Sequence, residues 1–407
     1  MRLTIDRLGH LGDGIGAGPD GAPVFVPRAL PGELVEGEVV AGRMDSPAIV
    51  TPSPERRRAP CPHYAACGGC ALMHATDAFV AGWKVGVVAE ALSAQGLSAD
   101  ILPIHTSPGQ SRRRATLAGR RTKKGAIVGF HGRASGTLVE PKECRLVLPA
   151  ILQTLPVMAA LTEAGGSRKG ELALTATVTE GGIDLSVAGG KPMDAGLFAR
   201  LAALAETADL ARLGWDGEVV AARRPARQRF GAALVTPPPG AFLQATQDGE
   251  AALLAAVRRA IGPARRVADL FSGSGTFSLP LAADAEVHAA ESDEEMIAAL
   301  LAAGRATPGL RPLTAEARDL FRRPLLPDEL ARFDAVVIDP PRAGAEAQAQ
   351  ELARSSLRRL AYVSCNPVTF ARDARILAAG GFRLDWVQPV DQFRWSTHVE
   401  LAAAFSR

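Results

Sequence analysis

The five cysteines of this 407-residue chain suit two different kinds of chemistry. Three of them crowd into Cys61-Pro-His-Tyr-Ala-Ala-Cys-Gly-Gly-Cys70, and Cys144 lies alone in Lys-Glu-Cys-Arg. Thiolates at such short spacing are typical ligands of a metal ion or an iron–sulfur centre. The fifth, Cys365, follows an apolar run in Tyr-Val-Ser-Cys-Asn-Pro, where one thiol can serve as a nucleophile. The sequence therefore predicts a reactive cysteine and a separate four-cysteine centre made of Cys61, Cys67, Cys70 and Cys144.

Disulfide bridges are the alternative use of these cysteines. The chain opens Met-Arg-Leu-Thr-Ile-Asp-Arg, without an apolar signal core, and no apolar run is long enough to span a bilayer. Large cytosolic proteins with few cysteines seldom form disulfides. We therefore expect a cytoplasmic protein without a membrane partner, whose cysteines bind ligands or react.

Composition and charge favour a globular protein with a polyanionic partner. The chain is 47% hydrophobic and 22% charged, which argues against wholesale disorder, and its net charge is only +3. Arginine and lysine nevertheless gather before residue 240, and such clusters can neutralise the phosphates of a nucleic acid. A solvated surface is the alternative for any one cluster. The clusters are Arg56–Arg58, Arg112–Arg114, Arg120 to Lys124, and Arg223 to Arg229.

Three stretches of different pattern divide the chain. Residues 1–55 alternate short β-type runs with glycine turns, which indicates a small barrel. Residues 56–240 are mixed: a helix is expected over Asp77–Leu92 and another over Leu201–Leu213, with hairpins over Ala115–Val139 and Leu172–Val187. The breaker Pro-Pro-Pro-Gly at 237–240 marks the next boundary.

From residue 241 to 407 the pattern alternates strand and helix, which predicts a doubly wound, mostly parallel sheet of the α/β class. Ligands on such sheets bind beyond the carboxyl ends of the strands. Polar residues gather at those ends: a Ser-Gly-Ser-Gly-Thr turn follows the first strand, and Glu291, Asp339 and Cys365 end later ones. The turn lacks the third glycine of a dinucleotide fingerprint. The sheet therefore looks like a methyltransferase that uses S-adenosylmethionine.

Four motifs make that resemblance specific. Asp269-Leu-Phe-Ser-Gly-Ser-Gly-Thr-Phe277, Asp339-Pro-Pro-Arg-Ala-Gly344, Ser364-Cys-Asn-Pro-Val-Thr-Phe-Ala-Arg-Asp373 and His398-Val-Glu400 resemble those of the RNA uracil-5-methyltransferase family. The cysteine spacing is similar to that of the iron–sulfur subgroup acting on 23S rRNA, and residues 1–55 resemble an OB-like TRAM domain, which binds RNA. The resemblance covers nearly the whole chain. It implies a class I methyltransferase domain over 241–407, a central domain over 56–240 carrying a 4Fe-4S cluster on the four cysteines, and no protein partner.

The chemistry of methylating uracil at carbon 5 calls for such residues independently of the resemblance. Carbon 5 of uracil is a poor nucleophile, and addition of a thiolate to carbon 6 turns the ring into an enolate that can attack a sulfonium methyl group. Cys365 is expected to supply the thiolate. The proton on carbon 5 must then leave before the thiol is eliminated, and a carboxylate suits that task. Glu400 matches the base of the family, although Trp395-Ser-Thr397 departs from the usual proline-containing approach to it.

Six further residues are expected to bind the methyl donor. Phe242-Leu-Gln244 resembles a Phe-Phe-Gln segment of the family, so Gln244 is expected to contact the donor or the flipped base. Glu291 is expected to hold the ribose and Asp319 the adenine. Phe271 and Thr276 should line the donor pocket, while Asp339 serves either the donor or the uracil edge.

Alternatives remain at this point. Zinc uses similar cysteine pairs, and His63 and His74 lie close enough to replace a missing ligand; the resemblance favours the cluster over zinc. A tRNA is the alternative to 23S rRNA. A non-catalytic RNA-binding protein and a nicotinamide-dependent oxidoreductase are the other classes considered. Since unstacking a base is least costly in a loop, we expect a loop uridine as target.

Overall fold

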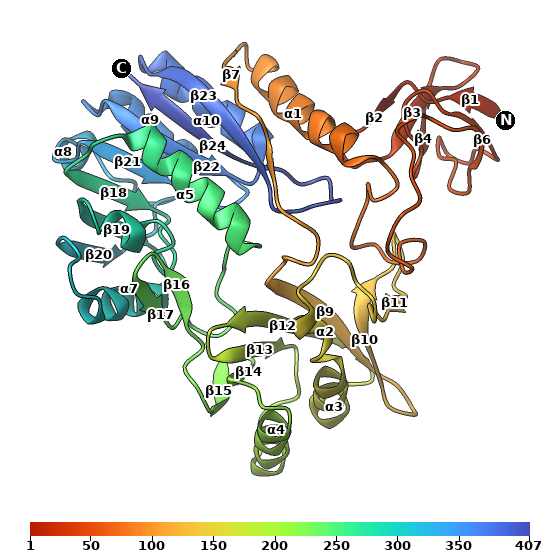
Figure 1. The fold of residues 1–407 in the computed structure, drawn as a ribbon, viewed down its shortest axis with the longest axis horizontal. Helices are drawn as coiled ribbons and strands as arrows, with labels where there is room; N and C mark the ends of the chain where they lie inside the picture. The colour runs from red at the N-terminus through yellow and green to blue at the C-terminus, as the bar shows by residue number, and fades with distance from the viewer.

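The computed structural model describes all residues from Met1 to Arg407 and places them in three parts (Figure 1). A group of short strands lies at one end, a seven-stranded sheet lies in the middle of the sequence, and a nine-stranded sheet holds the C-terminal part. No helix is both long and apolar enough to cross a membrane.

The N-terminal part, for which the sequence indicated a small barrel, consists of two three-stranded sheets. Their small apolar core contains Leu3, Val26, Val35 and Met44. The strand orders are β1-β5-β6 and β2-β3-β4. The strands are β1 (Arg2–Thr4), β2 (Arg7–Leu8), β3 (Gly14–Ala17), β4 (Pro23–Val26), β5 (Leu34–Glu36) and β6 (Ala48–Thr51).

The central sheet has the order β11-β10-β9-β12-β13-β14-β15 and includes both predicted hairpins. Helices α3 (Leu155–Gly165) and α4 (Ala195–Thr207) bury Met158, Leu161 and Leu201 against it. The other elements are β9 (Arg114–Arg121), β10 (Ala126–His131), β11 (Leu138–Val139), α2 (Pro149–Leu152), β12 (Glu171–Thr179), β13 (Gly182–Ala188), β14 (Arg212–Trp215) and β15 (Glu218–Ala222). Strands β16 (Gln228–Phe230) and β17 (Ala233–Val235) follow and form a separate two-stranded sheet.

The helix predicted over Leu201–Leu213 is wrong in its second half. Helix α4 begins earlier, where the side chain of Asp194 caps it by accepting from the N–H of Leu197, and it ends at Thr207. Asp209 adopts φ +50°, which stops the helix, and the chain turns into β14. There the Arg212 guanidinium makes a buried ion pair with Asp184 on β13 at 2.7 Å, so the tertiary contact selects a strand.

The C-terminal sheet confirms the predicted doubly wound, mostly parallel architecture. Its order is β20-β19-β18-β21-β22-β24-β23-β7, with β8 also on β23. The first five strands run parallel, and β24 is antiparallel to both neighbours. The strands are β18 (Arg266–Leu270), β19 (Glu286–Glu291), β20 (Leu313–Ala317), β21 (Ala335–Ile338), β22 (Arg359–Ser364), β23 (Arg383–Asp391) and β24 (Glu400–Ser406), joined by β7 (Asp100–Ile101) and β8 (His105–Thr106).

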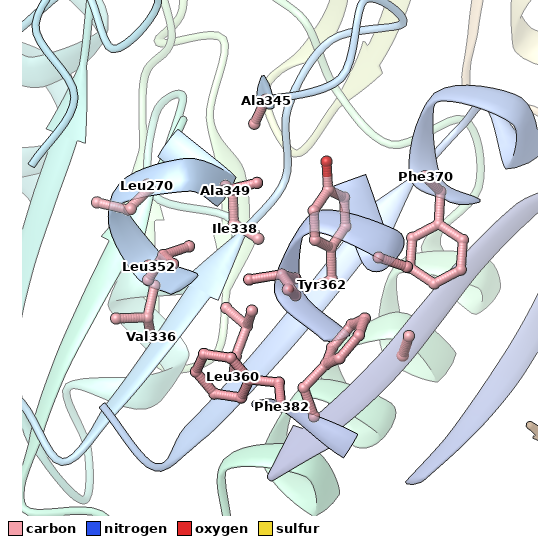
Figure 2. Packing of buried hydrophobic residues seen from close by; sticks show 14 of the residues in the cluster. Leu270, Val336, Ile338, Ala345, Ala349, Leu352, Leu360, Tyr362, Phe370 and Phe382 are labelled. Atoms are coloured by element: carbon pink, nitrogen blue, oxygen red, sulfur yellow. The ribbon is translucent and has the colours of Figure 1, made fainter. Parts of the chain in front are cut away.

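Apolar cores on both faces hold this sheet in place. Val336 and Ile338 of β21 face one core, and Ala335 and Val337 face the other, as the period of two in a strand requires. Figure 2 shows the first core, in which the α9 residues Ala349 and Leu352 and the α10 residue Phe370 pack on the strands. The helices are α5 (Gln247–Ile261), α6 (Ser278–Leu281), α7 (Glu294–Ala306), α8 (Pro327–Leu330), α9 (Glu346–Arg354) and α10 (Pro367–Ala379).

One helix from early in the chain also belongs to this packing. Helix α1 (Asp77–Ser93), where a helix was expected, places Val88 and Leu92 in the same core as α9 and α10. Strands β7 and β8 follow it and extend the C-terminal sheet beside β23. Residues 77–106 lie in the stretch expected to form the central domain, yet they pack on the C-terminal sheet.

Candidate active site

A cavity of about 430 Å³ opens at the carboxyl ends of the parallel strands. Its volume lies in the usual range for a small-molecule site. The cavity brings together all eight residues that the sequence proposed for catalysis and donor binding, although they come from seven segments of the chain. They are Gln244, Phe271, Thr276, Glu291, Asp319, Asp339, Cys365 and Glu400.

The turn after β18 shapes one wall of the cavity. Phe271, Gly273 and Gly275 all adopt positive φ, of 61°, 54° and 97°. A side chain at Gly275 would also put its Cβ 2.9 Å from the Cδ1 atom of Leu279, so glycine is needed there twice over. The backbone N–H of Gly273 donates to Glu291 Oε2 at 3.1 Å, which ties the turn to the end of β19.

Polar atoms without protein partners line or underlie this turn. Asp269, fully buried on β18, accepts from the Ser278 hydroxyl at 2.5 Å through one oxygen, while its other oxygen has no partner. The hydroxyls of Ser272 and Ser274 are also buried and unpaired. Unpaired buried polar groups are costly, and a polar ligand would satisfy them. Sequence reasoning gave these three residues no role; the available signal was an acid and two serines at the end of a predicted strand.

An aromatic wall lies beside the turn. The rings of Phe271 and Phe321 are 5.4 Å apart at 59°, and Leu320 lines the cavity next to them. Asp319 accepts from the N–H of Phe321 at 3.0 Å. A flat heteroaromatic group could stack on this wall and donate to the Asp319 carboxylate, as an adenine does.

The predicted nucleophile is held as a neutral thiol. Cys365 follows β22, and burial, reinforced by the charges of Glu400 and Asp339, raises the pKa of its thiol to about 11, against a smaller opposing effect of Arg342. A thiolate forms there more readily once positive charge enters the cavity. The cavity therefore suits a cationic ligand.

The carboxyl groups around Cys365 also indicate that the cavity binds a cationic ligand. Burial raises the pKa of Asp269 and of Asp339 to about 7, and that of Glu400 to about 8. The charge of Asp339 adds to the effect on Glu400. These carboxyls repel one another in a dry site, so a sulfonium and an ammonium group would stabilise their charged forms. The donor S-adenosylmethionine carries both groups and fits this arrangement.

Glu400 is part of a buried hydrogen-bond network. Its Oε2 atom accepts from the amide of Gln392, which also donates to Gln244 Oε1 at 2.5 Å. The amide of Gln244 in turn donates to Asp339 Oδ2 at 3.2 Å. The network links the residues that follow β21 and β23 to the start of β24, and no sequence pattern pointed to Gln392.

A second cavity, of about 280 Å³, is lined by Cys61, Cys67, Cys70 and Cys144 together. None of them forms a disulfide, and no three potential ligands converge on a single-ion geometry. Burial raises the pKa of Cys70 to about 12, with further contributions from the other three thiols. Thiolates packed this closely repel one another unless cations lie between them, so the chemistry of the donor set is compatible with a metal-containing group.

The two histidines considered as zinc ligands differ in position. His63 lines the four-cysteine cavity and accepts from the N–H of Glu143 at 3.2 Å. His74 lies outside the lining and is held by the hydroxyl of Tyr64, 2.6 Å from its Nδ1 atom.

Most of the arginine clusters are engaged within the protein. Arg113 is buried in an ion pair with Glu250 at 2.5 Å, and Arg112 stacks over Phe393 at 5.6 Å. Other pairs join Arg56 to Glu33, Arg120 to Glu171, Arg224 to Asp209 and Arg229 to Glu180. Arg113 links the central part to α5, whereas the pairs of Arg224 and Arg229 lie at the surface; all of these pairs leave less free positive charge for a nucleic acid than the sequence indicated.

Comparisons with known proteins agree with this geometry. A sequence model of the tRNA (Uracil-5-)-methyltransferase family matches residues 314–407. An uncharacterized RNA methyltransferase of Caulobacter vibrioides is 46% identical over 100% of this chain and 99% of its own length. A 23S rRNA (uracil(1939)-C(5))-methyltransferase of Chromohalobacter salexigens is 32% identical over 100% of this chain and 89% of its own length.

A solved structure shares the whole fold. The tRNA (uracil-54, C5)-methyltransferase of Pyrococcus abyssi, in complex with S-adenosyl-L-homocysteine, superposes with a TM-score of 0.77 over 100% of this chain and 99% of that one. The two are 23% identical in sequence, so this likeness concerns the fold. The C-terminal sheet accordingly has the class I methyltransferase fold.

Proposed function

We propose that this chain, which belongs to the RNA uracil-5-methyltransferase family, methylates carbon 5 of a uridine in 23S rRNA by covalent catalysis through Cys365. The observation that carries the proposal is the cavity at the strand ends, where Cys365 and Glu400 meet the glycine turn expected to bind the methyl donor. S-adenosylmethionine supplies the methyl group.

Two steps of the reaction have a residue in this cavity: Cys365 for the addition to uracil and Glu400 for removal of the proton from carbon 5. The thiol of Cys365 loses its proton, and its sulfur adds to carbon 6 of the uracil, which makes carbon 5 nucleophilic. Carbon 5 takes the methyl group, and the sulfonium becomes a neutral thioether. Glu400 removes the proton from carbon 5, and the electron pair of that bond expels the thiolate. One proton is released overall, and Cys365 is regenerated.

The donor-binding roles expected from the sequence fit the same cavity. Phe271 and Thr276 line the donor pocket, Glu291 holds the ribose and Asp319 the adenine. Gln244 and Asp339 line the cavity with Glu400, and their mutual hydrogen bond supports a shared role toward the donor or the base.

The 23S rRNA is proposed on the strength of the Chromohalobacter salexigens relative, and this substrate would place the reaction in the cytoplasm. A tRNA is the second candidate, favoured by the description of the matching family model. Residues 1–55 are proposed to be a TRAM-like domain that holds RNA. The central domain is proposed over 56–240 and the catalytic domain over 241–407, with residues 77–106 of the central stretch packed on the catalytic sheet.

We further propose a 4Fe-4S cluster on Cys61, Cys67, Cys70 and Cys144. The four thiolates would hold the cluster, because a set of four cysteines is the usual ligand set of a 4Fe-4S centre. The cavity between the four side chains supports this arrangement. Metal analysis of anaerobically purified protein tests the proposed cluster. A protein that contains zinc and no iron would show a zinc site instead.

Methylation of unmodified RNA tests the reaction and its substrate. Purified protein and S-adenosylmethionine are incubated separately with 23S rRNA and tRNA transcripts, which are then digested and searched for 5-methyluridine by mass spectrometry. The proposal expects 5-methyluridine in the 23S rRNA at one position. Product only in tRNA would select the second candidate, and no product with either RNA would favour a binding protein. S-adenosylhomocysteine, but not NAD, should raise the melting temperature.

A further inference from the structure

Gln392 lies directly behind the cavity without lining it. The residue follows β23, is 1% exposed, and is absent from the cavity wall formed by Gln244, Asp339, Cys365 and Glu400. Its side-chain amide nevertheless makes three hydrogen bonds to the residues that do line the cavity or support it. Any effect on the reaction must therefore pass through those neighbours.

A backbone group fixes the direction of the whole network. The N–H of Thr246 can only donate, and it donates to Gln392 Oε1 at 3.3 Å. The nitrogen of Gln392 must then face the other way, where its two hydrogens reach Glu400 Oε2 and Gln244 Oε1. Because the oxygen of Gln244 is occupied, its nitrogen faces Asp339, to which it donates.

The position of Gln392 is itself secured by its neighbour. Asp391 forms an ion pair with Lys84 of α1 at 2.6 Å, with side-chain exposures of 2% and 0%. Asp391 also accepts from the N–H of Phe393 at 3.1 Å, and its carbonyl accepts from Ser107. These contacts fix the backbone on both sides of Gln392.

We propose that Gln392 is a positioning residue that holds one oxygen of the Glu400 carboxylate, leaves the other free for the proton of carbon 5, and fixes the direction of the Gln244 amide. This inference rests on the proposed function and goes beyond it, because it assigns a role to a residue outside the cavity. With two N–H groups aimed at two fixed acceptors, Gln392 favours the charged form of Glu400.

The other charged groups around Glu400 oppose that form. Asp339, at the end of β21, and Cys365, after β22, both interact unfavourably with a negative charge on Glu400. Arg342 acts on Cys365 in the opposite direction, and Lys84 is occupied by Asp391. Burial raises the pKa of Glu400, and the hydrogen bond from Gln392 is the one effect that lowers it. Loss of that bond should therefore impair the base more than any other part of the site.

The test is the variant Gln392→Met, which keeps the length of the side chain and removes both donors. Its matched control is Gln388→Met on the same strand, because Gln388 donates to the Pro103 carbonyl away from the cavity. Single-turnover reactions with RNA carrying tritium on carbon 5 of uridine measure two rates: formation of the methylated covalent adduct, and release of tritium. Both are followed across the pH range, and S-adenosylhomocysteine binding is measured separately.

In Gln392→Met, tritium release should slow by about tenfold at neutral pH. The acid limb of its pH–rate profile should move up by about one pH unit. The methylated adduct should accumulate, while S-adenosylhomocysteine binding stays within about twofold of that of the parent protein. Gln388→Met should match the parent. If Gln392→Met releases tritium with an unchanged rate and pH profile, the inference is wrong.

Two outcomes keep the inference separate from the proposed function. A parent protein that forms no adduct and releases no tritium would overturn the proposed function itself. If Gln392→Met does not fold, Gln392→Glu keeps the shape and adds a carboxylate beside Glu400, so its acid limb should lie higher still. An unchanged limb in Gln392→Glu would refute the positioning role.

Discussion

The substitution Lys84→Met should destabilise the catalytic part of the protein more than any exposed charge change. Lys84 Nζ lies 2.6 Å from Asp391 Oδ1 and 3.2 Å from the carbonyl of Phe393, and the side chain is fully buried. Burial lowers the pKa of Lys84 and raises that of Asp391, so each charge persists because the other is present. Methionine leaves the Asp391 carboxylate with the N–H of Phe393 as its remaining donor.

Removing one partner of a buried ion pair costs about 3–5 kcal/mol. For a unit of this size the melting temperature should fall on the order of 10 °C. Because an unpaired Asp391 can take up a proton, the loss should be smaller at low pH than at high pH. The double variant Lys84→Met/Asp391→Asn removes the unpaired carboxylate as well. It should recover about half or more of the lost free energy of unfolding.

Heat denaturation followed by circular dichroism measures these shifts, with Arg266→Met as the control. Arg266 pairs with Glu286 on neighbouring strands of the same sheet at 3.3 Å, but the two side chains are 60% and 52% exposed. Such a pair contributes about 0–1 kcal/mol. A loss in Lys84→Met no greater than that in Arg266→Met would refute the reasoning, as would a double variant that is less stable than the single one.

Three further predictions concern the donor pocket, its carboxyls and the cysteine cavity. Gly275→Ala should weaken S-adenosylhomocysteine binding by about tenfold in calorimetry, whereas Gly309→Ala, also at positive φ but with open space around it, should not. The melting temperature of the ligand-free protein should fall as pH rises from about 4 to about 8 and then level off, because the folded state binds protons at Asp339 and Glu400 that the unfolded state has lost; saturating S-adenosylmethionine should reduce this dependence. Cys70→Ser should lower the iron bound per chain, measured by elemental analysis, without weakening S-adenosylhomocysteine binding.

The sequence could identify the residues around the active-site cavity for two reasons: Glu291, Asp339 and Cys365 lie at strand ends of recognisable pattern, and the others, such as Gln244 and Glu400, lie in motifs that resemble those of the family. The carboxyl ends of parallel strands share one edge of a sheet, so Glu291, Asp339 and Cys365 had to come near the glycine turn. The four cysteines could be grouped for a similar reason, since three share a short segment and one remained. No three-dimensional knowledge was needed for either grouping.

The supporting contacts could not be predicted, because they join residues far apart in the chain. Gln392 depends on Thr246 and Gln244, 146 and 148 positions earlier, and no local pattern marks that relation. Lys84 and Asp391 are 307 positions apart, and charged residues in a helix normally face solvent. The apolar segment after Thr207 suits helix and strand equally, and its pairing with β13 decided the outcome.

The most direct test of the proposed function is covalent capture with RNA that carries 5-fluorouridine. Fluorine on carbon 5 cannot leave as a proton, so an enzyme working through Cys365 should stall as a protein–RNA adduct in the presence of S-adenosylmethionine. We expect an adduct that survives denaturing electrophoresis with the parent protein and is absent with Cys365→Ala, although Cys365→Ala still binds S-adenosylhomocysteine. An adduct that persists in Cys365→Ala, or none with ribosomal or transfer RNA from active protein, would contradict uracil methylation through this cysteine.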